Sequence, residues 1–145
     1  MSEACTKRLM NELRKLPTNA VMRAAGWSVG QASEADLLKW QGHVKGPTGT
    51  PYEGGTFYFT IHFDRNYPWK PPRVKFTTPL YHPMVDRQGS VCHEWLHHGW
   101  VPRVDIGELV QLLKALLHYP LEIETLPDGS PHLSLIHISE PTRPY

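Results

Sequence analysis

Strict alternation of apolar and polar residues over positions 56–63 is the feature that most constrains how this chain can fold. Its apolar members share one side of an extended segment, and two later residues continue the pattern: Phe57, Phe59, Ile61, Phe63, Val74 and Phe76. This period of two is that of half-buried strands. Because the connections between residues 37 and 76 are short, they predict an antiparallel meander. One face of the sheet must be covered, and we expect the N-terminal helix to cover it.

That N-terminal helix is predicted by an amphipathic segment that stops at Pro17. On a helical wheel its apolar face holds Cys5, Leu9, Leu13 and Leu16, and its basic face holds Lys7, Arg8, Arg14 and Lys15. The basic face is either a solvated surface or a docking surface for an acidic partner.

A second helix is predicted after residue 104. Asp105 and Glu108 have the spacing of a capping box, and Pro120 ends the helix. Its buried stripe consists of Ile106, Leu109, Val110, Leu113, Leu116 and Leu117.

Composition limits the class of protein. The chain has 145 residues, enough for one domain, and 15 Lys+Arg against 14 Asp+Glu give a net charge of +1. We therefore expect no binding of nucleic acid through bulk charge. No apolar run approaches the roughly 20 residues that span a bilayer, and 2 cysteines are too few for a disulfide scaffold. The expectation is a cytoplasmic or nuclear protein without a membrane partner.

Residues 78–104 show no periodicity, and a long irregular stretch inside a compact domain is usually functional. It contains Cys92, preceded by Gly89-Ser90, whose turn could expose the sulfur. His82 and His93 could lower the thiol pKa if they lie near it. Taken alone, Cys92 is either a nucleophile or a buried structural cysteine. Zinc binding by Cys92 with nearby histidines is a weaker alternative, because the ligand spacing is poor.

Several motifs together resemble the ubiquitin-conjugating enzymes, in that family's order and spacing, over about residues 5–122. They are Trp40, Gly46-Pro47, Thr50-Pro51-Tyr52-Glu53-Gly54-Gly55, Phe57, Tyr67-Pro68-Trp69-Lys70-Pro71-Pro72, Tyr81-His82-Pro83, Gly89-Ser90-Val91-Cys92 and Trp100-Val101-Pro102.

The resemblance implies an α+β fold, with a four-stranded antiparallel meander sheet flanked by an N-terminal helix and by a helix after the active-site loop. It also implies that Cys92 accepts ubiquitin, or a ubiquitin-like protein, as a thioester from an activating enzyme. The acyl group then passes to a substrate lysine or to a ligase's own cysteine, and a RING- or HECT-type ligase is implied as a partner. No cofactor is implied, because the upstream enzyme consumes the ATP.

Other roles follow from the same resemblance. Lys7 and Arg8 match basic residues that face the activating enzyme, and Trp69 and Pro102 match ligase-contacting positions. His82 and Pro83 belong to the active-site loop.

The sequence departs from the family at two places. Met84 occupies the position of an asparagine thought to stabilise the oxyanion, and a thioether donates no hydrogen bond. Glu124 stands where a gate residue or base is often found, although the surrounding loop differs. An alternative function is therefore a catalytically weak or inactive variant that binds ubiquitin or a partner.

The C-terminal end of the sequence contains fewer recognisable motifs. We expect a conjugating core over residues 1–132 that lacks the family's last two helices. Residues 133–145 are expected to be a non-native or disordered tail that does not pack.

Overall fold

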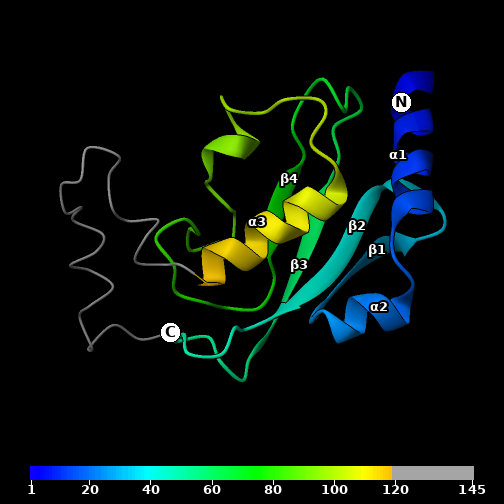
Figure 1. Cartoon of the computed structure of the whole chain (residues 1–145). Coiled ribbons are helices and arrows are strands. Elements are labelled where there is room, and N and C mark those ends of the chain that lie inside the picture. The colour runs from blue at the N-terminus through cyan, green and yellow to red at the C-terminus, as the bar shows by residue number, and fades with distance from the viewer. Residues whose placement is uncertain (119–145) are drawn as a thin grey trace.

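The computed structural model describes residues 1–118 and contains one four-stranded antiparallel sheet in the order β1-β2-β3-β4 (Figure 1). The strands are β1 (Trp27–Ser33), β2 (Asp36–Lys45), β3 (Thr56–His62) and β4 (Arg73–Phe76). The helices are α1 (Glu3–Lys15), α2 (Asn19–Ala24), the 3-10 turn η1 (Glu94–Leu96) and α3 (Ile106–His118). The meander predicted from the sequence is confirmed.

The alternation in β3 decides which side of the sheet is buried. Phe57, Phe59 and Ile61 are buried, whereas the residues between them are partly or fully exposed. The register pairs Trp40 with Ile61 and Ile61 with Val74, so buried side chains of three strands lie in one row. The apolar core grows from this row.

The N-terminal part of the sheet was not predicted. Strand β1 and helix α2 carry no clear apolar period, because small and polar residues interrupt both segments. Local chemistry nevertheless explains them. The Thr18 hydroxyl accepts the Val21 N–H at the start of α2. Gly26, with φ +82°, turns the chain into β1, a conformation that glycine adopts at little cost.

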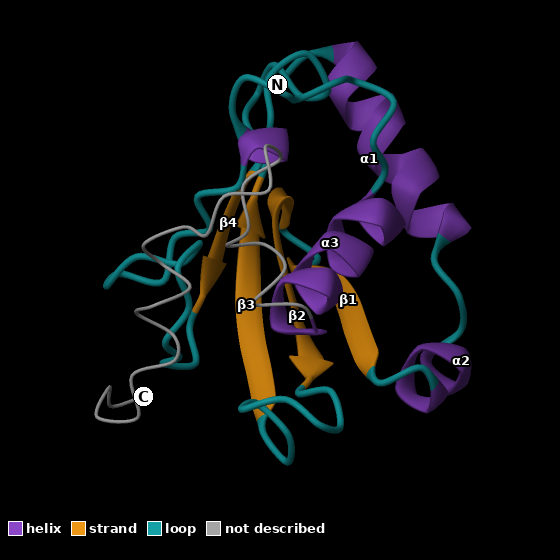
Figure 2. Cartoon of the chain, turned by 60° about the vertical axis from the view of Figure 1, so that its left-hand side comes forward, coloured by secondary structure: helices purple, strands orange, loops and turns teal. Residues whose placement is uncertain are grey.

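The helix that covers the sheet is α3, so the expectation that the N-terminal helix covers it was wrong. Helix α3 lies across one face of the sheet, whereas α1 stands beside the end of the sheet in both views (Figures 1 and 2). The physical reason is the apolar area of each helix. Helix α3 buries seven residues, all apolar, whereas α1 buries Cys5, Leu9 and the charged Glu12.

The predicted capping box at the start of α3 is confirmed. The Glu108 N–H donates to Asp105 Oδ1 at 2.8 Å, and the Asp105 N–H donates to Glu108 Oε1 at 3.3 Å. Pro120, predicted to end this helix, lies outside the described residues. Within residues 1–118, no helix has the length and apolar character needed to cross a membrane.

Two glycines on adjacent strands give a matched test of this packing. A Cβ on Gly42 would lie 2.0 Å from the Ser28 carbonyl oxygen and 2.8 Å from the Phe59 ring, whereas one on Gly30 would meet nothing within 4 Å. We expect Gly42→Ala to lower the free energy of unfolding by about 1–3 kcal/mol through overpacking. Gly30→Ala should be neutral or stabilising by up to about 1 kcal/mol. Urea denaturation measures both, and equal stability of the two variants would contradict this packing.

Candidate active site

Cys92 follows a segment that runs antiparallel to strand β4. Bridges to β4 and to the loop after it fix the backbone of this segment. Isolated bridges pair Lys75 with Ser90 and Val85 with Val91. The Cys92 N–H donates to the Met84 carbonyl at 2.7 Å. The side chain of Cys92 is exposed, whereas Cys5, the other cysteine, is fully buried. The chain therefore presents one thiol to solvent on a well-defined backbone.

A tight turn ahead of Cys92 depends on Asp86 and Gly89. Asp86 Oδ1 accepts the N–H groups of Gln88 and Ser90, both at 2.9 Å. Gly89 has φ +91°, and a Cβ there would lie 2.0 Å from the Phe76 carbonyl oxygen. Only glycine fits this close approach, so the Gly89-Ser90 signal in the sequence has a steric cause.

His82 fixes the other side of the active-site loop. Its Nδ1 accepts the Met84 N–H at 2.9 Å, so Nε2 carries the proton and donates to the Leu116 carbonyl of α3 at 2.6 Å. Burial lowers the pKa of His82, and the hydrogen bond to Leu116 offsets part of that effect. His82 is therefore a neutral anchor between the loop and α3, with Pro83 half-buried beside it.

The condition under which His82 and His93 would lower the pKa of Cys92 is not met, because neither histidine is among the groups that act on the thiol. The pKa of Cys92 is raised, first because partial burial disfavours the thiolate and then because the Asp86 carboxylate repels it. A hydrogen bond from the Asp86 backbone favours the thiolate and offsets part of the rise. His82 is committed to Leu116 and Met84, and the pKa of His93 is itself lowered, chiefly by burial.

Met84 retains the backbone contacts of its position while its side chain supplies no polar group. Its carbonyl accepts from Cys92 and its N–H donates to His82. Because that N–H already has a partner, it is not available to a developing oxyanion. The loop is thus held in place without a side-chain amide at this position.

Two loops with exposed hydrophobic tips are joined at one end of the domain. Trp69 is 70% exposed and Val101 40% exposed. The indole N–H of Trp100 donates to the Pro68 carbonyl at 2.8 Å, and its ring packs against Tyr67 at a centroid distance of 6.0 Å. Pro102 is half-buried, so of the two predicted ligase-contacting residues Trp69 is the more exposed.

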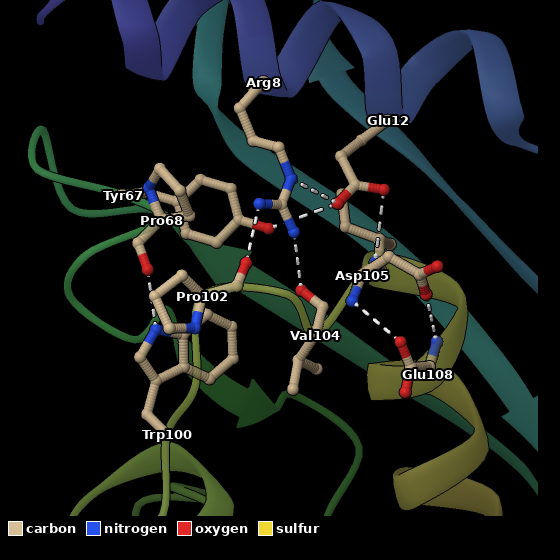
Figure 3. Close-up of polar contacts among 10 residues, drawn as sticks. Arg8, Glu12, Tyr67, Pro68, Trp100, Pro102, Val104, Asp105 and Glu108 are labelled. Carbon is tan, nitrogen blue, oxygen red and sulfur yellow. Dashed lines mark hydrogen bonds and ion pairs between the residues drawn. The ribbon is translucent and has the colours of Figure 1, made fainter.

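Lys7 and Arg8, the predicted docking pair, have different surroundings. Lys7 is exposed. Arg8 turns toward the protein, where its guanidinium donates to the Pro102 carbonyl at 2.6 Å and to the Val104 carbonyl at 2.9 Å (Figure 3). The placement of Arg8 on the solvated face of the wheel was therefore wrong, and its contacts support a structural role.

Glu12, which the sequence reading missed, is the buried centre of this cluster. Its carboxylate accepts from Arg8 Nε at 3.0 Å, from the Tyr67 hydroxyl at 3.4 Å and from the Ile106 N–H at 3.5 Å (Figure 3). Burial, followed by the nearby Glu12 charge, raises the pKa of Tyr67. The available signal was a carboxylate on the apolar side of the helical wheel, four residues after an arginine.

Zinc binding finds no geometric support in the described part of the chain. Within residues 1–118, no three His, Cys, Asp or Glu side chains are close enough to hold a metal ion. Glu124, the predicted gate residue or base, lies outside the described residues, as do the C-terminal part of the predicted core and the predicted tail.

Comparisons with known proteins agree on one family. The family model described as ubiquitin-conjugating enzyme matches residues 8–129. The structure is similar to human ubiquitin-conjugating enzyme E2 G1, with 34% sequence identity and a TM-score of 0.68 over 79% of this chain and 92% of that chain. It is also similar to the E2 domain of a Toxoplasma gondii ubiquitin-conjugating enzyme, with 35% identity and a TM-score of 0.66 over 79% and 75% of the two chains.

Removing the buried carboxylate should destabilise the domain. We expect Glu12→Leu to lower the free energy of unfolding by about 3 kcal/mol, because Tyr67, Ile106 and Arg8 each lose a hydrogen-bond acceptor. Glu12→Gln, which keeps an acceptor oxygen, should lose less. Urea denaturation followed by circular dichroism measures both. The exposed Glu34→Leu is the control, expected within about 0.5 kcal/mol of wild type; a Glu12→Leu variant as stable as this control would contradict the assigned role.

Proposed function

The chain belongs to the ubiquitin-conjugating enzyme family, and from that premise we propose that it carries ubiquitin, or a ubiquitin-like protein, as a thioester on Cys92. One observation carries the proposal: within residues 1–118, Cys92 is the exposed cysteine, and it occupies the nucleophile position of the family motif.

Each transfer exchanges one acyl bond for another. The Cys92 sulfur attacks the thioester carbonyl on the activating enzyme, a new carbon–sulfur bond forms, the old one breaks, and the Cys92 proton ends on the departing thiol. In the second step a lysine amine attacks the thioester carbonyl, a carbon–nitrogen bond forms, the carbon–sulfur bond breaks, and the proton lost by the amine is balanced by the one that Cys92 takes up as it leaves as the thiol. Transfer to a ligase cysteine repeats the first step.

The raised pKa of Cys92 suits an acyl carrier. A mostly protonated thiol reacts slowly with unactivated acyl groups, which protects it from unwanted chemistry. Its minor thiolate fraction is intrinsically more nucleophilic than that of an acidic thiol, because nucleophilicity rises with pKa. Attack on an already activated thioester therefore remains feasible.

We assign the surfaces that bind partner proteins from the exposure of their side chains. Lys7 is offered to the activating enzyme, and Trp69, supported by the Trp100–Pro68 hydrogen bond, is offered to a ligase together with Pro102. Arg8 holds the Pro102 carbonyl, so it acts on the ligase surface as a positioning residue.

Charging is the direct test. The protein is incubated with ATP, ubiquitin and its activating enzyme, and in parallel with ubiquitin-like modifiers and theirs, and is then run on a non-reducing gel. We expect a band of added modifier mass that reductant removes. Cys92→Ser should abolish it or convert it to a reductant-stable ester, and Cys5→Ala, which changes the buried cysteine, should keep it. A chain that no modifier charges would instead be a binding module of the same fold.

Because Met84 has no side-chain amide, we expect slow transfer of the modifier from Cys92 to lysine. The charged protein is separated from the activating enzyme and mixed with free lysine, and loss of the thioester is followed with time. We expect Met84→Asn to accelerate this discharge by up to about 10²–10³-fold, because an amide donor can stabilise the oxyanion. Charging itself should not change. Met84→Leu is the matched apolar control. Rapid wild-type discharge that Met84→Asn leaves unaltered would refute this role.

A further inference from the structure

A row of basic side chains crosses three strands on the face of the sheet opposite to the core. The register places Lys39 of β2 opposite His62 of β3, and His62 opposite Arg73 of β4. Lys75 lies two residues further along β4. These positions alternate with buried residues of the same strands, and Lys39, Arg73 and Lys75 are exposed.

The three cations Lys39, Arg73 and Lys75 share this face of the sheet, and Asp36 is an acidic residue whose charge acts on His62 in the row. Neighbouring strands are about 4.8 Å apart, so Lys39 and Arg73, which flank His62 on its two sides, have backbones about 10 Å apart. Within residues 1–118, none of Lys39, Arg73 and Lys75 forms an ion pair with an acidic side chain. Partial burial, followed by Lys39 and Arg73, lowers the pKa of His62, and Lys75 adds to this effect against an opposing influence of Asp36. A local positive field thus exists on a chain of net charge +1.

A groove of about 450 Å³ lies beside this row, between β4 and the segment that contains η1. Its lining combines the basic His62, Arg73 and Lys75 with apolar side chains that include the buried Val91 and Leu96. The groove therefore combines an apolar surface with positively charged side chains.

This combination selects among anionic partners. Single-stranded nucleic acid is typically held by basic residues together with aromatic platforms on which bases stack, and no Phe, Tyr or Trp is among the residues of 1–118 that line the groove. An extended acidic peptide matches better, because one apolar side chain can enter the groove while neighbouring carboxylates meet the cations.

We propose that this groove, defined by His62, Arg73, Lys75, Val91 and Leu96, docks an acidic peptide segment of a partner protein. An apolar side chain of the segment occupies the groove, and its carboxylates face Arg73 and Lys75. This interaction goes beyond the proposed acyl transfer and does not use the Cys92 thiol.

Fluorescence anisotropy with a defined probe tests the proposal. The probe is a short labelled peptide in which one leucine is flanked by glutamates, titrated with the full chain and with its Cys92→Ser variant. We expect both proteins to bind it, and the charge-reversal variant Arg73→Glu/Lys75→Glu to bind about tenfold or more weakly. Binding should also weaken as salt is added. The matched control Lys15→Glu/Arg23→Glu, with the same change in net charge on α1 and α2, should stay within about twofold of wild type.

Folding and specificity are checked alongside. Arg73→Glu/Lys75→Glu should keep the wild-type melting temperature, because both side chains are exposed on the surface of the sheet. Binding that survives this reversal would overturn the proposal. So would equal binding of a peptide with glutamines in place of glutamates, tighter binding of a single-stranded oligonucleotide, or no binding of the probe. Since the Cys92→Ser protein is included, a failure of charging does not affect this result.

Discussion

Glu12 places a carboxylate, with 2% of its surface exposed, at the point where α1 meets the loop after β3 and the start of α3. A buried charge is costly unless it is paired and hydrogen-bonded, and here an arginine, a tyrosine hydroxyl and a backbone N–H meet that need. These partners come from three separate segments of the chain. This side chain therefore joins α1 to the loop after β3 and to the start of α3, beside the apolar contacts of Cys5 and Leu9.

The same cluster explains why two distant loops form one surface. Arg8, held by Glu12, also binds the carbonyls of Pro102 and Val104, while Trp100 binds the Pro68 carbonyl. The exposed ring of Trp69 follows directly after Pro68. The hydrophobic tips are thus presented by loops whose backbones are fixed from beneath, which reduces the conformational entropy that binding a partner would cost.

Around Cys92, hydrogen bonds hold the loop in a defined conformation, and few polar side chains are placed to take part in the reaction. His82, the Asp86–Gly89 turn and the Met84 carbonyl fix the loop, and the thiol is left exposed with a raised pKa. The sequence could place Cys92 in this irregular segment and identify Met84 as a departure from the family. It could not show that His82 serves α3 rather than the thiol, because that depends on a contact 34 residues away.

The sequence by itself determined the elements whose signal is local: the alternation of β3, the Asp105–Glu108 cap and the glycine turn before Cys92. The strand follows from periodicity and the cap from hydrogen bonds between residues three positions apart, whereas the glycine turn is a local signal whose steric cause, the Phe76 carbonyl, only the structure shows. Only the tertiary structure decided that α3 covers the sheet, that Arg8 faces inward and that Glu12 is buried. These outcomes depend on which surfaces compete for the same apolar face and on where a buried charge finds its partners, and both are set by residues far apart in the chain.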